Sequence, residues 1–461
     1  MADATTRLMR PSLSFALLAG FLSMVLLSGG ASRADAFGQV VVRVVAWALL
    51  LVAVLFGRRP RREDVGPTAL LLGAALLLVL LQLIPLPPAI WQALPGRGIF
   101  AEAASAGGRP QPWRPWSIVP GATVNAASSL VVPITTLVLM AGLAPEEQPR
   151  VPGLLLCLIG VSALIGLLQF SGAQLDNPLV NDTPGEVSGL FANRNHFALF
   201  TAIGCLLAPA WAFQEGRAPH WRGPLAPALV LVFALIVLAS GSRAGIILAV
   251  LGSGVGMLLA WKGIGRSLRR YPRWVFTALL AGGAALVATT VLISIAAGRA
   301  VSISRALAID PGQDMRSRGL PTVWGMIREY FPMGSGLGGF DPIFRLHEPF
   351  GLLKLTFFNH AHNDFLELAL DAGLPGLLLL AVALAWWGWA GLKAWRSGDA
   401  AGRFLPRLGS TILLLILIAS AFDYPARTPM IMAVAVVAAL WLDDRGRAVG
   451  RSALPGGRQH L

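Results

Sequence analysis

Long apolar runs, separated by short loops rich in Arg, Gly and Pro, dominate this chain. A helix needs about 20 mainly apolar residues to cross the roughly 30 Å hydrocarbon core of a bilayer. Only 13% of the 461 residues are charged, whereas soluble domains carry about 25%. The chain is therefore predicted to fold as an all-α polytopic membrane protein. The apolar content excludes fibrous, disulfide-rich and disordered classes.

The apolar runs predict about twelve transmembrane helices. They cover residues 12–29, 41–57, 67–84, 124–143, 153–170, 196–213, 225–240, 244–261, 275–296, 373–392, 408–422 and 429–442. Several of them are near the lower length limit for a span, about 17 residues. An alternative for 225–240 and 244–261 is a single re-entrant hairpin. The first run also resembles a signal peptide, but its length and the closely following second run favour a retained span.

Basic residues cluster on one side of these spans. The clusters follow the second, eighth, tenth and last spans, at residues 58–62, 262–273, 393–407 and 445–458. An excess of Lys and Arg marks the cytoplasmic side, so both termini are predicted to be cytoplasmic. The net charge of +14 is thereby explained by topology, and nucleic acid is not an expected partner.

The outward side receives the long connections, at residues 85–123, 171–195 and 297–372. Their tryptophans and other aromatic residues predict interfacial helices on the outer leaflet. The glycine-rich run at 334–339 is similar to a nucleotide loop, but no predicted strand precedes it. A flexible turn near the histidine-containing segment is the better interpretation.

Polar residues at membrane depth are the informative ones in so apolar a chain, because they are costly there and usually functional. Three groups map to the outer side. They are Asn193-Arg194-Asn195-His196, Ser240-Gly241-Ser242-Arg243, and the segment from Asn359 to Asp364 that continues to Glu367 and Asp371.

The two arginines, Arg194 and Arg243, are candidate anion-binding residues. One interpretation is that they extend to lipid headgroups at the helix ends. However, arginine is disfavoured in short outer loops, and Arg243 lies in a turn too tight to leave the membrane surface. A fixed guanidinium there suits a phosphate or pyrophosphate, which it can hold through two parallel charge-assisted hydrogen bonds.

The histidines at 360 and 362 allow two interpretations. One is a metal pair, with Asp364 as a third ligand; the other is a general base, since imidazole titrates near pH 6.5. Asp364 and Glu367 together form a plausible capping box at the start of a helix. Asn363, Glu367 and Asp371 would form one polar stripe, which predicts a polar cavity. Cys157 and Cys205 fall inside apolar runs, so neither a disulfide nor a four-ligand zinc site is expected.

The third polar group resembles the signature of the O-antigen ligase and polymerase family. The similarity lies in residues 360–367 (HAHNDFLE) and 372–376 (AGLPG). Weaker resemblances occur in the family's order at residues 82–87 (QLIPLP), 189–196 (GLFANRNH), 242–245 (SRAG) and 422–425 (FDYP). The resemblance extends from about residue 66 to residue 442.

This resemblance implies a glycosyltransferase of the multi-span, GT-C-like type, in the bacterial inner membrane, with its active site facing the periplasm. Such enzymes move a glycan from an undecaprenyl-pyrophosphate carrier to an acceptor hydroxyl; ligases deliver it to the lipid A-core, polymerases to another lipid-linked unit. Membrane lipids are the other expected partners, and neither metal nor cofactor is implied. The implied organisation is N-terminal helices at 1–65, a ligase-like domain at 66–442 and a cytoplasmic tail at 443–461.

The resemblance also implies residue roles. Arg194 and Arg243 correspond to the family's functional arginines and His362 to its histidine, with His360 as the competing candidate and Asn193, Asn363 and Glu367 in support. The resulting hypothesis is direct, inverting displacement, with the arginines on the pyrophosphate and a histidine taking the acceptor proton. A transporter is the rival from another class, but the two halves of the chain do not repeat and the polar residues gather at one face.

Overall fold

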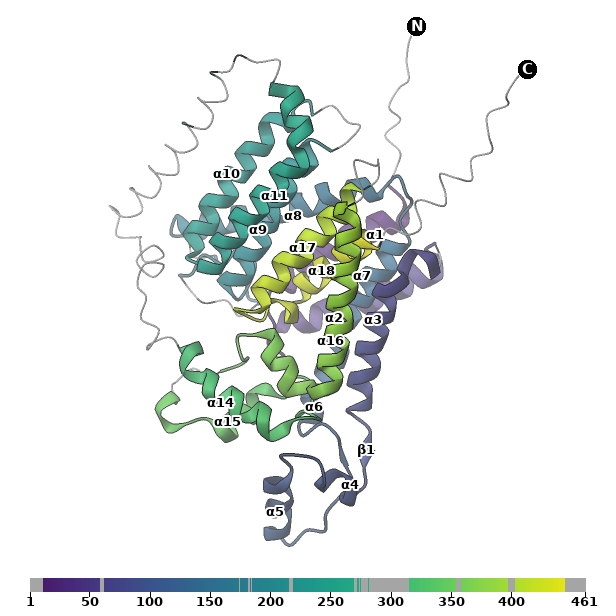
Figure 1. Ribbon diagram of the computed structural model, residues 1–461, viewed down its shortest axis with the longest axis vertical. Coiled ribbons are helices and arrows are strands. Elements are labelled where there is room, and N and C mark those ends of the chain that lie inside the picture. The colour runs from purple at the N-terminus through teal and green to yellow at the C-terminus, as the bar shows by residue number, and fades with distance from the viewer. Residues whose placement is uncertain are drawn as a thin grey trace, which may run out of the picture.

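The structure is a computed structural model that describes residues 11–58, 62–173, 175–180, 183, 185–214, 219–268, 272, 274, 281, 315–353, 358–396 and 403–443. These residues form a mostly helical molecule, in agreement with the predicted all-α polytopic membrane protein. Figure 1 shows the long helices side by side, with shorter helices gathered at one end. A two-stranded sheet at that end is an addition that the sequence did not predict.

Within the described residues, seven helical segments are long and apolar enough to cross a membrane. They are α2 (Phe37–Phe56), α6 with α7 (Pro120–Ser129 and Val131–Ala141), α8 (Val151–Phe170), α9 (Arg194–Ala212), α10 (Arg222–Ser240), α11 (Arg243–Leu268) and α16 (Asp364–Arg396). Because α10 and α11 each reach this length, they favour two spans over one re-entrant hairpin.

Four shorter apolar helices coincide with further predicted spans: α1 (Leu13–Ser28), the part Val65–Leu81 of α3 (Arg62–Leu81), α17 (Phe404–Ser420) and α18 (Pro429–Leu442). The predicted span at 275–296 lies almost wholly outside the described residues. The total of twelve spans therefore stays a prediction.

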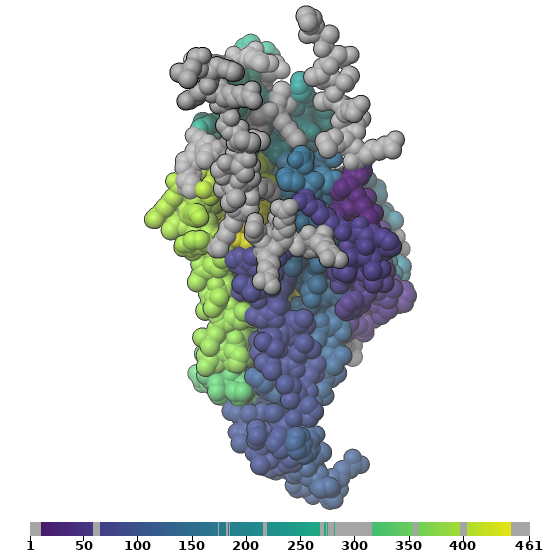
Figure 2. Space-filling model, turned by 90° about the vertical axis from the view of Figure 1, so that its right-hand side faces the viewer, coloured from purple at the N-terminus to yellow at the C-terminus, as the bar shows by residue number. Residues whose placement is uncertain are grey.

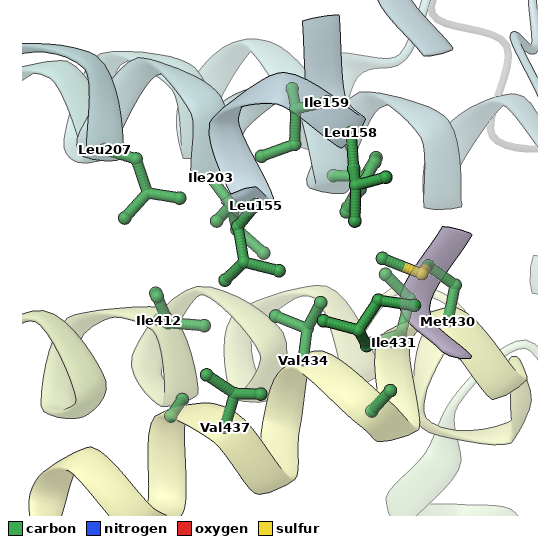
Figure 3. Close-up of a cluster of buried hydrophobic side chains, with 14 of the residues drawn as sticks. Leu155, Leu158, Ile159, Ile203, Leu207, Ile412, Met430, Ile431, Val434 and Val437 are labelled. Carbon is green, nitrogen blue, oxygen red and sulfur yellow. The ribbon is translucent and has the colours of Figure 1, made fainter. Parts of the chain in front are cut away.

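Helix α9 is the most buried of the candidate spans in the described residues, with 89% of its apolar window inside the molecule. It packs against α8, α10, α11 and α17. The close-up in Figure 3 shows how the side chains interdigitate, with Leu155 and Ile159 of α8 and Ile203 of α9 facing Ile412 of α17 and Val434 of α18. This packing fixes the position of the polar N-terminal end of α9.

Glycines allow α11 to lie directly against α9. A Cβ atom on Gly245 would come within 2.5 Å of the Ala198 Cβ, and one on Gly252 would come within 2.8 Å of the Ala202 carbonyl oxygen. At Gly256 the Leu206 carbonyl oxygen would be 2.6 Å away. Small residues permit this close approach of backbones in membranes. The two helices thus run in parallel and begin at the same end of the molecule.

Helix α16 changes direction at Gly373, whose φ of 55° is left-handed and favours glycine. The glycine-rich run at 334–339 packs against this bend. The amide of Ser335 donates to the Leu370 carbonyl, and the amide of Gly338 donates to Oδ2 of Asp371. The run forms a turn, as predicted, but this turn is held in place, because the amides of Ser335, Gly336 and Gly338 donate to α16 and the amide of Leu337 donates to Oε1 of Gln82.

Residues 82–119 form a small extension beyond the long helices, visible at the lower end of Figure 2. It contains the sheet of β1 (Pro85–Leu86) and β2 (Arg114–Pro115), with α4 (Pro88–Gln92) and α5 (Gly98–Ala106). Arg97 anchors it: the guanidinium is fully buried and donates to the carbonyls of Trp116 and Gly334, each at 2.9 Å. Burial lowers the pKa of Arg97 to about 10.

Beside this extension lie α14 (Met315–Tyr330) and α15 (Phe340–His347). They share a small second core, centred on Met326, Tyr330 and Phe344. The connections at 85–123 and 297–372 therefore contain helices, as the sequence predicted, whereas the described residues of the connection at 171–195 form none before α9 begins at Arg194. Their location on the outer leaflet stays a prediction.

Candidate active site

Asp423, between α17 and α18, is the centre of the polar site. Its Oδ1 lies 3.1 Å from Nδ1 of His362, and the Asp423 side chain is only 4% exposed. A carboxylate is an acceptor, so Nδ1 of His362 carries the proton and Nε2 of the neutral ring has its lone pair available. Within the described part of the chain, that Nε2 has no hydrogen-bond partner.

The backbone of His362 adopts a left-handed conformation, with φ of 51°. This conformation is unfavourable for a non-glycine residue by about 1–2 kcal/mol. Such residues concentrate at functional sites, where the surrounding contacts hold them in place. Here the ring is held between Phe358 and Tyr424, with centroids 5.7 and 5.0 Å away.

Three further side chains donate to Oδ2 of Asp423. They are Asn193 at 3.1 Å, Asn195 at 2.6 Å and Arg316 of α14 at 3.3 Å. Burial by itself would raise the pKa of Asp423, but the hydrogen bond from His362 and the nearby positive charges outweigh it and hold this pKa below its usual range. The carboxylate is therefore ionised and can stabilise a protonated His362.

Arg194 begins α9 directly between the two asparagines that bind Asp423. Asn193 caps the helix, since its Oδ1 accepts from the amide of Asn195 at 2.8 Å. The guanidinium of Arg194 lies 3.2 Å from Oε1 of Glu186, and both side chains are 29% exposed. Arg194 is thus beside the His362–Asp423 pair and is ion-paired with a carboxylate from the preceding loop.

Arg243 is the first residue of α11, and its side chain is exposed. The contact between Gly245 and Ala198 places it within about one turn of the start of α9. Ser242 fixes this turn by accepting from the amide of Gly245 at 3.1 Å. The two predicted arginines therefore begin neighbouring, parallel helices.

His360 faces a different carboxylate. Its Nδ1 lies 2.8 Å from Oε1 of Glu367, and its Nε2 lies 3.1 Å from Oγ of Ser32 in the turn between α1 and α2. Glu367 is fully buried and also accepts from the amide of Ala361 at 2.8 Å. Both ring nitrogens of His360 are thus occupied, in contrast to those of His362.

Arg427 lies at the centre of the buried carboxylates of α16. Its Nε is 3.3 Å from Oδ1 of Asp364 and 3.2 Å from Oε1 of Glu367, and its Nη1 is 3.7 Å from Oδ2 of Asp371. The sequence predicted that the stripe of Asn363, Glu367 and Asp371 would line a polar cavity. In the structure Arg427 occupies that position, because three carboxylates at this depth require a counter-charge.

The predicted capping box at Asp364 is wrong. Asn363 caps α16, since its Oδ1 accepts from the amides of Phe365 and Leu366, each at 3.0 Å. Asp364 is already inside the helix, where its Oδ2 accepts from Ser420 at 2.9 Å. Glu367 cannot complete the box, since its carboxylate binds His360 and the amide of Ala361.

The ligand set of the metal alternative is not assembled. His360 and His362 bind separate carboxylates, and Asp364 faces Ser420 and Arg427. No group of three potential His, Cys, Asp or Glu ligands occurs within the residues that the structure describes.

The structure brings into the site several residues that the sequence analysis gave no role. They are Ser32, Glu186, Arg316, Asp423, Tyr424 and Arg427. One signal was present in the sequence: Asp423 and Arg427 are opposite charges in the short connection between two apolar runs. Charged residues at such depth pair with one another and mark functional sites.

Comparison with known proteins finds two similarities. The model of the O-antigen ligase family matches residues 228–381, a segment that contains Arg243, His360 and His362. The exopolysaccharide production protein ExoQ of Rhizobium meliloti is 28% identical over 240 residues. That similarity covers 50% of this chain and 52% of the relative, so the chain aligns with about half of ExoQ. The chain is thus similar to O-antigen ligases over residues 228–381 and to ExoQ over about half of its length.

Proposed function

We propose that this protein transfers a glycan from an undecaprenyl-pyrophosphate carrier to an acceptor hydroxyl at the periplasmic face of the inner membrane. The observation that carries the proposal is the pairing of His362 with Asp423, with Nε2 of the ring available. A neutral imidazole oriented by a buried carboxylate is suited to take a proton from a hydroxyl. The similarity of residues 228–381 to O-antigen ligases supports a lipid-linked glycan as the class of substrate.

Arg194 and Arg243 would bind the donor pyrophosphate. Two guanidinium groups at the start of parallel helices add their charge to the partial positive charge of the helix N-termini. As the bond from the anomeric carbon to the pyrophosphate breaks, negative charge grows on the leaving oxygen and these groups stabilise it. Arg316, which is ion-paired with Asp423, would be a third positive charge in the site, after those of Arg194 and Arg243.

His362, and not His360, would be the base. Nε2 of His360 is engaged by Ser32, whereas no partner for Nε2 of His362 is recorded in the described residues. In the proposed step Nε2 takes the acceptor proton, the acceptor oxygen bonds to the anomeric carbon and the pyrophosphate leaves on its lipid. A single displacement of this kind inverts the anomeric centre.

The proposed acceptor is the lipid A-core, as for ligases of the family. A second candidate acceptor is a growing exopolysaccharide chain, which is favoured by the similarity to ExoQ, an exopolysaccharide production protein. Both candidates use the same donor chemistry.

Deletion in the source bacterium distinguishes these acceptors. If the protein is a ligase, a gel of surface glycans will show loss of capped lipid A-core together with retained long lipid-linked chains. If it is a polymerase, chain length itself will collapse. Purified protein that fails to move glycan from an intact lipid-linked donor to either acceptor would overturn the proposal.

Labelling of cysteines introduced beside Arg194 and His362 should occur only from outside, because labelling from both sides would indicate a transporter.

A further inference from the structure

Ser32, His360 and Glu367 form a hydroxyl–imidazole–carboxylate series that the proposed transfer does not use. The distances are 3.1 Å from Oγ of Ser32 to Nε2 of His360, and 2.8 Å from Nδ1 of His360 to Oε1 of Glu367. The carboxylate requires the proton on Nδ1, so the neutral ring presents its Nε2 lone pair to the hydroxyl. This is the order of groups in which enzymes activate a serine.

The carboxylate and the ring of this series are held in place. Glu367 is fully buried, accepts from the amide of Ala361 and is ion-paired with Arg427. The ring of His360 packs on Tyr424 with centroids 4.2 Å apart. An ionised, immobile carboxylate can stabilise the imidazolium that forms when His360 takes a proton.

The backbone segment that carries Ser32 lies beside the segment that leads into Arg194. The carbonyl of Gly30 accepts from the amide of Ala192 at 3.1 Å, two residues before Arg194. The hydroxyls of Ser23 and Ser240, by comparison, donate to carbonyls of their own helices, at 2.8 and 2.7 Å. Ser32 is only partly buried, and its recorded hydrogen bond is the one to the imidazole.

We propose that Ser32 is an internal acceptor, at which the chain attaches a glycan to itself; this inference rests on the proposed function. Nε2 of His360 takes the proton from Oγ of Ser32 as Oγ bonds to the anomeric carbon. The bond from that carbon to the pyrophosphate oxygen breaks, and the lipid pyrophosphate leaves against the arginines. The product is an O-glycosyl serine, which is stable and accumulates.

The test uses the full-length protein in nanodiscs with no external acceptor. The donor is undecaprenyl-pyrophosphate-linked glycan, extracted from membranes of cells that lack this protein. Intact-mass measurement and peptide mapping should find one glycan on Ser32 in the wild type and in His362→Ala. Ser32→Ala should carry none, Ser32→Thr should retain it, and His360→Ala should form it about 100-fold more slowly.

Ser28→Ala is the matched control. Ser28 lies at the end of α1, and its buried hydroxyl has no hydrogen-bond partner among the described residues, so this variant should be modified like the wild type. Modification of Ser32 is ruled out, and the proposed function kept, if the wild-type protein transfers glycan to an external acceptor but carries no glycan on Ser32, and His362→Ala carries none either. Absence of transfer to any acceptor, internal or external, overturns the proposed function instead.

Discussion

The carboxylate of Asp423 and the imidazole of His362 meet at 3.1 Å although they are 61 positions apart in the chain. The contact joins the start of α16 to the connection between α17 and α18, and the amide of Asp364 adds a hydrogen bond to the Asp423 carbonyl at 3.3 Å. The proposed base and the carboxylate that orients it are thus held by helix ends.

Removal of this pair should affect the rate more than binding. His362→Gln should lower kcat by about 10²–10⁴-fold, the usual contribution of a general base. Asp423→Asn should give a smaller loss, because the amide can still accept from Nδ1 but does not stabilise the imidazolium. Steady-state assays with lipid-linked donor measure both. His347→Gln is the control, since its ring binds Tyr330 at 2.9 Å; wild-type kcat in His362→Gln would contradict the role.

Replacement of either arginine by lysine should weaken donor binding even though the charge is kept. Lysine cannot form the two parallel hydrogen bonds that a guanidinium makes to a phosphate. We expect Arg194→Lys and Arg243→Lys each to raise the KM for donor about tenfold, which corresponds to about 1.4 kcal/mol. Arg345→Lys, in an exposed ion pair with Asp341, should match the wild type. Unchanged donor KM in both site variants would exclude pyrophosphate binding by these residues.

A side chain at Gly256 should force α11 away from α9. The added Cβ would be 2.6 Å from the Leu206 carbonyl oxygen, whereas at Gly254 it would meet nothing within 4 Å. Overpacking of this kind costs about 1–3 kcal/mol. Thermal unfolding in detergent should therefore show a lower Tm for Gly256→Val and an unchanged Tm for Gly254→Val. Equal Tm values for the two variants would show that the helices are not in this contact.

Arg427 should be essential for stability because three carboxylates surround it. Arg427→Met would leave Asp364, Glu367 and Asp371 without their counter-charge, and loss of one partner of a buried ion pair costs about 3–5 kcal/mol. Arg345→Met breaks an exposed pair, worth about 0–1 kcal/mol. The yield of folded protein and its unfolding temperature should fall for the first variant only. A folded Arg427→Met protein with wild-type Tm would contradict the ion-pair assignment.

Two of the three tyrosines in the chain should resist ionisation. Burial, helped by the neighbouring charges of Glu329 and Asp423 respectively, raises the pKa of Tyr330 and of Tyr424 from 10.0 to about 12. Because the pKa of each phenol is higher in the folded than in the unfolded protein, the protonated phenol contributes to the free energy of unfolding. This contribution is fully present below pH 10 and is lost as the pH rises through 12. In the folded protein, absorbance measured at alkaline pH should show both phenols titrating with a pKa near 12. After unfolding, they should titrate near 10. Titration near 10 in the folded protein would show that they are exposed.

The helices were predictable because burial in a membrane depends on local composition. The runs at 153–170 and 429–442 correspond closely to Val151–Phe170 and Pro429–Leu442. The residues at 194, 243, 360 and 362 could also be selected, since polar residues stand out in apolar surroundings.

The pairing of the polar residues could not be predicted in the same way. Asp364 is polar and near a helix start, which suggested a cap, but Asn363 takes that position and Ser420 binds Asp364 instead. Arg427 binds carboxylates more than 50 positions away, and no sequence spacing encodes such a contact. The same holds for Ser32, whose partner His360 is 328 positions away.

The close glycine contacts between α9 and α11 set the backbone spacing between the helix starts that carry Arg194 and Arg243. If the proposed function holds, the two arginines would keep this spacing on the donor pyrophosphate while the long connections diverge to admit different acceptors. Exchange of connections between relatives would then be a route to new glycan products.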